Sequence, residues 1–492
     1  MIHKKKNEKW IWEWERQMYP FIWWNIGMMY IHDRTFTPYP TETVFISRGT
    51  TAEMYFHRSS LERIALYFLK KIEKDGVFMS LFRNEVKREE RYIKEFGKNM
   101  LQKDFSKLPN EALCTYLSQY SRLYRQHGVG VIRSVNRIGL EMLQNFFQKH
   151  YPLEEGLTLL KTLTRSTRKS EFQRAQDSMQ GLAKMIARNP RWFRFFRNNT
   201  PKQIINALKK RNTLYQPLSS YLKRYGYLQC GYIDELPITY AQLIKNVRKE
   251  ICSVKRNHTG DVVLPVSIAR QSYPLPIRRL GTALSEFTYY KDHIRSYYNF
   301  LHYSTRELFE ECASRLKVSL PELRMLTPDE IIDALKSGTF NKRTIVNRQK
   351  LCVIHCTAKK QEILTGKHAR TFLKRELHFR NTKQMREIHG ICAQKGHAVG
   401  TVKIIKKPED FDGNNQNFIL VTPMTTPELM PVAREALAIV TDEGGITCHA
   451  AIIAREMQKP CIIGTRIASR VFRDGDYVEV DASQGVIRLK HK

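Results

Sequence analysis

The sequence predicts a multidomain protein, with a large, mostly α-helical N-terminal region followed by a smaller C-terminal α/β domain. Two patterns indicate this. Through the first 345 residues, apolar side chains recur at helical spacing and strand-like runs are scarce. From residue 387 onward, short β-branched runs alternate with closely spaced glycines. We therefore expect a helical domain over 1–345, a linker over 346–386 and an α/β domain over 387–492.

Cap residues mark where individual helices of the N-terminal region begin. Ser59 and Glu62 read as a capping box, and Thr327 before Pro328 reads as a second helix start. Only residues 43–55 alternate like a strand pair, and there we expect a hairpin. Further helices are expected over 86–101, 110–124, 131–147, 170–187, 201–225 and 281–316.

The net charge of +34 is concentrated in the N-terminal region. Residues 391–492 carry 13 basic and 12 acidic side chains, so the excess belongs almost entirely to the first 390 residues. Such a surface attracts nucleotides, nucleic acid, anionic lipid or phosphorylated substrates. This basic surface is either an ordinary solvent-exposed surface or one that binds phosphate groups. Because no named nucleic-acid-binding motif is present, nucleic acid is a possible but not favoured partner.

The cysteines and the apolar runs bear on the cellular location, on metal binding and on membrane contact. The nine cysteines are scattered, and residues 1–17 lack the pattern of a secretory signal, so we expect reduced thiols and a cytoplasmic location. Cys352, His355 and Cys356 could bind zinc, but no second ligand pair follows, and we expect a buried strand and no metal. The most apolar run, residues 18–31, is shorter than the roughly 20 residues of a membrane span, so we expect no membrane contact.

The residues that carry chemistry lie between a predicted strand, 438–440, and a predicted helix that opens at His449. Gly444 and Gly445 allow a sharp turn that brings backbone N–H groups near an anion. The helix N-terminus also favours negative charge. A phosphoryl group on the His449 imidazole would therefore be stabilised, and the Thr447 hydroxyl could fix the tautomer of the ring. The alternative is a partly buried histidine with a structural role.

The run around His449 resembles the phosphohistidine signature of the phosphoenolpyruvate-utilising enzymes. That signature is a glycine pair, any residue, Thr, then Ser or Cys, His, two alanines, two aliphatic residues, Ala-Arg-Glu, and later Pro and an aliphatic-Gly pair. This chain has every element, including Arg455, Pro460 and the Cys448 form associated with phosphoenolpyruvate synthases. The resemblance extends to residues 388–402, 420–428 and 474–485.

The resemblance implies that residues 387–492 form a mobile, swivelling β/β/α phosphohistidine domain. His449 would accept a phosphoryl group from ATP held by an ATP-grasp domain, or from phosphoenolpyruvate, and pass it on. The same resemblance places Gly444, Gly445, Thr447 and Cys448 beside the phosphate or the imidazole. Arg455 would also support the site.

Residues 1–345 resemble the central helical region of rifampicin-phosphotransferase-like proteins, which implies an acceptor domain. Residues 226–228 read Gly-Tyr-Leu where that family has a Gly-His-Arg-like step. We recognise no ATP-grasp domain, no Gly-rich phosphate loop and no phosphoenolpyruvate-binding barrel. We therefore expect no cofactor bound by this chain itself. ATP and Mg²⁺ would come through a separate ATP-grasp nucleotide-binding protein, and the acceptor would be a small molecule.

Three functions fit these observations. The chain is a phosphotransferase component, a non-catalytic phosphohistidine carrier or regulator, or a basic helical nucleic-acid-binding protein with a relict swivelling domain. A phosphotransferase needs an acceptor pocket within reach of His449, whereas a regulator needs only a docking face. A nucleic-acid binder would show a steep salt dependence that survives His449→Ala.

Overall fold

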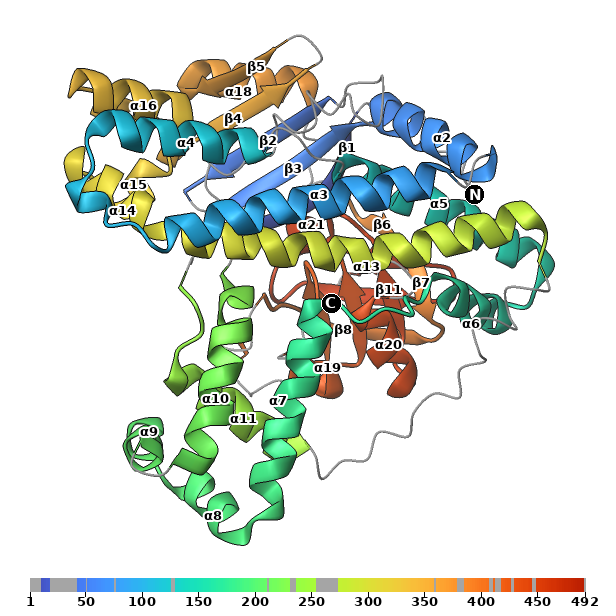
Figure 1. The fold of residues 1–492 in the computed structure, drawn as a ribbon. Coiled ribbons are helices and arrows are strands. Elements are labelled where there is room, and N and C mark those ends of the chain that lie inside the picture. Colours follow the sequence, from blue (N-terminus) through green and yellow to red (C-terminus); the bar gives the residue numbers. More distant parts are fainter. Residues whose placement is uncertain are drawn as a thin grey trace. The chain divides into compact units, whose positions relative to one another are not determined.

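The computed structural model describes residues 10–17, 42–49, 51–74, 77–124, 129–209, 212–230, 236–253, 273–357, 360–377, 385–406, 410–411, 417–425, 429–444 and 448–490. Contacts divide the chain into two units (Figure 1). The helical unit comprises Met1–Glu8, Arg16–Ala52 and Phe56–Gly366. The C-terminal unit comprises Lys9–Glu15, Glu53–Tyr55 and Lys367–Lys492, and so includes short pieces of the N-terminal chain.

The helical unit is built around one long central helix, α13 (Leu275–Ser304). Its side chains Phe287, Tyr290 and Tyr297 are almost fully buried. Phe82 of α3 meets Phe287 edge-on, with ring centroids 5.2 Å apart. The other helices in this first part of the unit are α2 (Arg58–Lys74), α3 (Val77–Met100), α4 (Asn110–Tyr124), α5 (Val129–His150) and α6 (Leu153–Thr164).

A second group of helices in the same unit has its own hydrophobic core. Ile186, Phe196, Ile204, Leu243 and Val247 are at its centre. We call this group the α7–α11 bundle; it is drawn in green in Figure 1. It consists of α7 (Glu171–Arg188), α8 (Pro190–Asn198), α9 (Pro201–Lys209), α10 (Asn212–Tyr225) and α11 (Tyr240–Ser253).

One helix expected from the sequence is interrupted, because the 281–316 stretch divides into α13 and α14 (Arg306–Arg315). The 201–225 stretch contains α9 and α10, and residues 210–211 between them lie outside the described residues. At the break after α13 the Thr305 hydroxyl donates to the Leu301 carbonyl oxygen at 2.7 Å. Such back-bonding by a β-branched hydroxyl competes with the helical hydrogen bonds and favours a bend.

The two expected helix caps have different outcomes. Thr327 caps α16 (Pro328–Ser337), because its hydroxyl accepts from the Glu330 N–H and the Glu330 carboxylate accepts from the Thr327 N–H. The Ser59 cap is wrong, because α2 already begins at Arg58. There the Ser60 hydroxyl donates to the His57 carbonyl oxygen and accepts from the Glu42 N–H.

A five-stranded sheet has the order β1-β3-β2-β4-β5. Its strands are β1 (Trp10–Gln17), β2 (Thr43–Arg48), β3 (Thr51–His57), β4 (Cys352–Cys356) and β5 (Gln361–Thr365). The hairpin expected over 43–55 is confirmed as β2 and β3, which turn at Gly49 with φ +60°. Residues 18–31, the most apolar run, lie outside the described residues.

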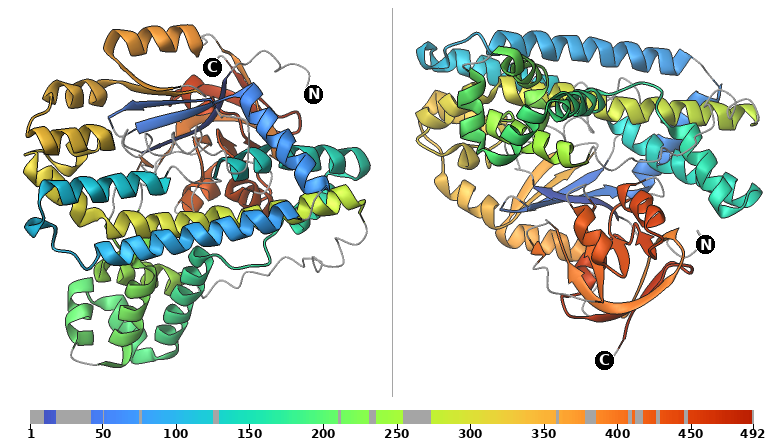
Figure 2. Two further views of the ribbon diagram at one scale, coloured as in Figure 1. Left: turned by 45° about the horizontal axis from the view of Figure 1, so that its top comes forward. Right: turned by 90° about the horizontal axis from the view of Figure 1, so that it is seen from below.

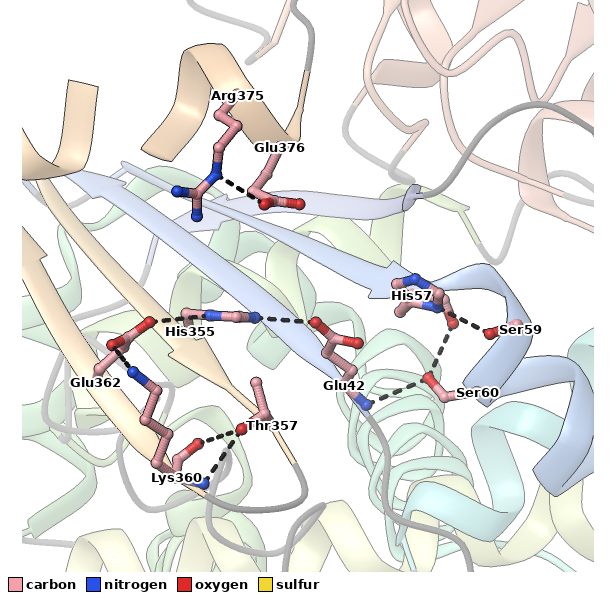
Figure 3. Close-up of polar contacts among 10 residues, drawn as sticks. All are labelled: Glu42, His57, Ser59, Ser60, His355, Thr357, Lys360, Glu362, Arg375 and Glu376. Carbon is pink, nitrogen blue, oxygen red and sulfur yellow. Dashed lines mark hydrogen bonds and ion pairs between the residues drawn. The ribbon is translucent and has the colours of Figure 1, made fainter. Parts of the chain in front are cut away.

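The Cys352–Cys356 segment is a buried strand, as expected. Successive side chains of a strand point to opposite faces, so Cys352 and Cys356 lie on one face and His355 on the other. The His355 ring lies between two carboxylates, 3.1 Å from Glu42 and 3.2 Å from Glu362 (Figure 3). The three potential zinc ligands therefore do not converge.

The 346–386 stretch contains more regular structure than the linker we expected. β4 pairs antiparallel with both β2 and β5, with Ile354 opposite Phe45 and Ile363. Helix α17 (Lys342–Lys350) precedes this pair of strands, and α18 (Gly366–Glu376) follows it. Four of the five residues of β4 are buried, and such an apolar run is typical of a strand inside a sheet that is covered on both faces rather than of a linker.

The C-terminal unit contains an eight-stranded mixed sheet with the order β6-β13-β12-β8-β9-β10-β11-β7. Figure 2 draws this part of the chain in orange and red. Strands β8 to β11 are parallel at its centre, and the flanking strands run antiparallel. The strands are β6 (Glu387–His389), β7 (Ile391–Gln394), β8 (His397–Ile404), β9 (Phe418–Thr422), β10 (Ala438–Thr441), β11 (Cys461–Ile463), β12 (Tyr477–Asp481) and β13 (Val486–Leu489).

Three short helices pack with this sheet: α19 (Met430–Glu435), α20 (His449–Glu456) and α21 (Ala468–Val471). Ala468 of α21 shares a core with Val440 and Ile462 of the central strands. Helix α20 connects β10 to β11 and packs on both and on β7. The predicted fold class, a large helical N-terminal region followed by a C-terminal mixed α/β part, is confirmed.

We expect Arg348→Ala to lower the free energy of unfolding of the helical unit by about 2 kcal/mol, the usual cost of charge-assisted hydrogen bonds. The buried Arg348 guanidinium donates twice to the Glu330 carboxylate, at 2.6 Å each, and once to the Met325 carbonyl oxygen at 2.7 Å. Urea unfolding followed by circular dichroism measures the change. Arg343→Ala, on the exposed side of the same helix, is the control, and equal losses in both variants would contradict the expectation.

Candidate functional site

The candidate site lies where strand β10 ends and helix α20 begins. Strand β10 pairs in parallel with β9 and β11, with Thr441 opposite Thr422 at its carboxyl end. The carboxyl ends of parallel strands are the usual place for ligand-binding loops in α/β sheets. The loop that follows Thr441 leads directly to His449, the first residue of α20.

Asp442 anchors the start of this loop. Its carboxylate accepts hydrogen bonds from the Thr465 hydroxyl at 2.9 Å, from the Ser469 N–H at 3.2 Å and from the Ser469 hydroxyl. Its backbone N–H donates to the Thr422 carbonyl oxygen, and its own carbonyl oxygen accepts from the Arg466 N–H. The side chain is only 2% exposed. The loop is therefore fixed to β9, to the segment after β11 and to α21.

Burial raises the pKa of the Asp442 carboxyl, although the hydrogen bonds from Ser469 and Thr465 act in the opposite direction. A buried carboxylate is costly unless donors satisfy its oxygens. Here both oxygens have donors. The site therefore tolerates a desolvated acid next to the glycine turn.

Close backbone approaches explain the glycines of the turn. Gly444 has φ +121°, and a Cβ built there would lie 2.7 Å from the Cys448 Sγ. A Cβ on Gly464 would lie 3.1 Å from the Gly444 carbonyl oxygen. Neither position accepts a larger residue without movement. The loop after β10 and the loop after β11 thus meet at their glycines.

Cys448 is the N-cap of α20, so the helix starts as the sequence analysis expected. Burial raises the pKa of the Cys448 thiol, while the Ala450 and Ala451 amides at the helix start lower it. The unpaired N–H groups of a first turn attract anions. Gly445 and Thr447 lie outside the described residues, so their expected roles stay predictions.

Arg455 attaches α20 to the sheet. Its Nε–H donates to the Ala393 carbonyl oxygen of β7 at 3.0 Å, and burial lowers the pKa of its guanidinium. The sulfur atoms of Cys461, Cys448 and Cys392 are its electrostatic neighbours. The contact with β7 gives Arg455 a structural role, and its support of a phosphate remains a prediction.

Sequence reasoning missed a polar network that lies next to Asp442. Arg470, in α21 beside Ser469, donates to the Glu53 carboxylate at 2.8 Å and to the Tyr55 hydroxyl oxygen at 3.2 Å. The Tyr55 hydroxyl in turn donates to Glu53 at 2.7 Å. Burial raises the pKa of Tyr55. No local sequence signal reveals these pairs, because about four hundred residues separate the partners.

Among the described residues, no group of three or more His, Cys, Asp or Glu side chains is arranged to hold a metal ion. No described helix has both the length and the apolar character needed to cross a membrane.

Comparison with known proteins agrees with the geometry of the loop. Residues 414–485 match the family "PEP-utilising enzyme, mobile domain". The match covers β9, β10, α20 and β11, and so includes the whole candidate site. The resemblance to phosphoenolpyruvate-utilising enzymes is thereby confirmed for this part of the chain.

Curated relatives match the same part. A probable phosphoenolpyruvate synthase of Archaeoglobus fulgidus is 45% identical over 100 residues, which is 20% of this chain and 13% of that protein. The phosphoenolpyruvate synthase of Pyrococcus furiosus is 39% identical over 121 residues, 24% of this chain and 15% of that protein. The uncharacterized phosphotransferase YvkC of Bacillus subtilis is 47% identical over 102 residues, 21% of this chain and 12% of that protein. The chain thus spans between 12% and 15% of the length of these relatives.

Among solved structures, a solution structure of Enzyme I covers 39% of this chain and 54% of its own length. It has 16% sequence identity and a TM-score of 0.15, so no argument rests on it.

We expect Gly444→Ala to destabilise the loop by on the order of 2 kcal/mol, because a side chain at φ +121° is strained and its Cβ would overlap Cys448. Hydrogen exchange of the α20 amides, followed by mass spectrometry, measures the local effect. Gly181→Ala in α7 is the control, since a Cβ there meets no atom within 4 Å. It should stabilise its helix by roughly 0.5–1 kcal/mol. Unchanged exchange in α20 would contradict the expectation.

We expect Asp442→Asn to alter the pH dependence of stability of the C-terminal unit. Since the folded pKa of Asp442 is raised, the native state binds the proton more tightly than the unfolded chain does. Its contribution to stability is therefore fully present below the unfolded pKa of about 3.9 and is lost as pH rises from there through the folded pKa. Hydrogen exchange of β10 at several pH values should show the variant gaining on wild type as pH rises. A constant difference would contradict the expectation.

Proposed function

We propose that this chain is a phosphotransferase component in which His449 is transiently phosphorylated and passes the phosphoryl group to a small molecule. The single observation that carries the proposal is the position of His449. It is the first residue of α20, directly after a glycine turn at the end of a central parallel strand. The matched family region includes this turn and helix.

The chemistry of the loop supports this role. An imidazole at a helix N-terminus holds a transferred phosphoryl group near N–H dipoles that stabilise its negative charge. Phosphoryl transfer depends mainly on alignment and charge stabilisation, so a rigid turn is useful. The hydrogen bonds of Asp442 to Thr465 and Ser469 hold the start of this loop in place, which supports the proposal.

We further propose that the donor is ATP, bound with Mg²⁺ by a separate ATP-grasp protein, or else phosphoenolpyruvate. The similarity to the curated relatives covers only a small part of their length. The helical unit would hold the acceptor. A cytoplasmic location, where ATP is abundant, completes the proposal.

A phosphohistidine carrier or regulator without a small-molecule acceptor is the alternative. The match to the mobile domain supports both readings equally, because it concerns only the phosphorylated module. What distinguishes them is turnover. An enzyme discharges its label to a small molecule, whereas a carrier keeps the label until a partner protein removes it.

Label transfer tests the proposal. Wild type, incubated with β-labelled ATP or with labelled phosphoenolpyruvate and an extract of the source organism, should acquire acid-labile, alkali-stable label. His449→Ala should lose at least 95% of that label, because one nucleophile carries the group.

His397→Ala is the matched control, since this exposed histidine of the same unit pairs with Glu479 at 2.8 Å. It should keep the wild-type label. Equal labelling of His449→Ala and wild type, or no label from either donor, would overturn the proposal. Release of label into a small molecule favours the enzyme over the carrier.

A further inference from the structure

The α7–α11 bundle carries an unusually one-sided charge. Residues 171–253, which span the bundle, contain 15 Lys and Arg and five acidic residues, a net charge of +10. Nearly a third of the net charge of the whole chain therefore lies in about a sixth of its length. The described helices of the bundle share a hydrophobic core, so their basic residues are carried by a folded scaffold.

The structure places a row of arginines on one side of α8. Arg191, Arg194 and Arg197 are exposed and follow one another at three-residue intervals, so they share one side of the helix. Phe196 is fully buried on the other side, and Trp192 packs against the core of the bundle. We call the three side chains the α8 arginine face.

Nearby basic residues extend this surface. Lys184 and Arg188, in the second half of α7, are exposed, and so is Lys202 at the start of α9. A short turn joins α7 to α8, because Asn189 is the C-cap of the first helix and the N-cap of the second.

No carboxylate of the described residues neutralises the α8 arginine face. The two acidic side chains of α7 lie in its first half and are already paired. Asp177 is 2.7 Å from Lys169, and Glu171 is 2.6 Å from Arg174. The three guanidinium groups repel one another because they carry the same charge. A bound polyanion would neutralise them and remove this repulsion.

We propose that the α8 arginine face and its neighbours bind the phosphate backbone of a nucleic acid. Arginine suits this role because its planar guanidinium donates two hydrogen bonds to one phosphate. This proposal goes beyond the proposed function and does not depend on His449. It adds a macromolecular partner to the phosphotransferase role.

An acidic protein fits this surface less well. Protein interfaces have an apolar centre with a polar rim. Among the described residues of 171–253, the only exposed large hydrophobic side chains are Met185 and Leu236. A surface with abundant charge and little exposed apolar area matches a phosphate chain held mainly by electrostatics.

Fluorescence anisotropy with a labelled single-stranded RNA and a labelled DNA duplex, on the full chain, tests the proposal. Affinity should fall steeply between about 50 and 200 mM salt. The triple variant Arg191→Gln/Arg194→Gln/Arg197→Gln should bind at least tenfold more weakly. The slope of log K against log salt should also become shallower by roughly 2–3, since each lost phosphate contact contributes 0.7–0.9.

Lys87→Gln/Arg91→Gln/Lys98→Gln on α3 is the matched control, because it removes the same charge from exposed helical positions elsewhere in the helical unit. It should change the affinity less than twofold. Lys184→Glu/Arg188→Glu on α7 is a second variant, which should also weaken binding strongly. It keeps the test decisive if the triple variant fails to fold. His449→Ala should bind as wild type does, so a failure of the proposed function leaves this result unaffected.

The proposal is overturned by the absence of binding at low salt, or by equal losses in the α8 and α3 variants. The latter result would show that only net charge matters. Tighter binding of polyglutamate than of either nucleic acid would also overturn it, and would point to an acidic protein.

Discussion

The parallel pairing of β10 with β9 and β11 is the constraint on which the candidate site depends. It fixes the point where the chain leaves the sheet, and so fixes the first residue of α20. Helix α20 then returns the chain to β11, beside the strand it left, as a parallel connection requires. The backbone of His449 is therefore placed by this crossover connection.

Asp442 fixes the chain just after β10, at the energetic cost of burying a carboxylate. Its carboxylate is desolvated, but its donors come from the segment after β11 and from α21, so it joins pieces of chain that the sheet alone leaves free. Truncation of such an acid would leave the Thr465 and Ser469 donors unpaired, which is usually more costly than the net value of the hydrogen bonds. A strongly held start of the loop suits phosphoryl transfer, where small errors in alignment lower the rate.

Motifs of neighbouring residues predicted most helices and strands. Contacts between residues far apart in the sequence could not be predicted in this way. Thr327 and Ser59 look alike in sequence, yet only Thr327 is a cap. At Ser59 the chain arrives from a strand, and the neighbouring Ser60 bonds Glu42. The β10–α20 turn was predictable because its glycines, its cap and its helix are contiguous. The Glu53–Arg470 pair was not, because 417 residues separate the partners and only the complete fold brings them together. The same holds for β4, whose partners β2 and β5 include a strand three hundred residues earlier.

The two roles proposed for this chain should depend differently on salt, because the two units differ in charge. The C-terminal residues 391–492 are nearly neutral, with 13 basic and 12 acidic side chains, although the candidate site would carry a charged phosphoryl group. In the proposed function, N–H dipoles at short range would stabilise that group, and salt screens such interactions weakly when water is excluded. The α7–α11 bundle relies instead on many exposed cations, whose attraction to a polyanion weakens steeply as salt displaces it. Phosphorylation of His449 should therefore persist at salt concentrations that abolish nucleic-acid binding. If both activities fell together with salt, one basic surface would have to serve both, and the separation of roles drawn from the charge distribution would be wrong.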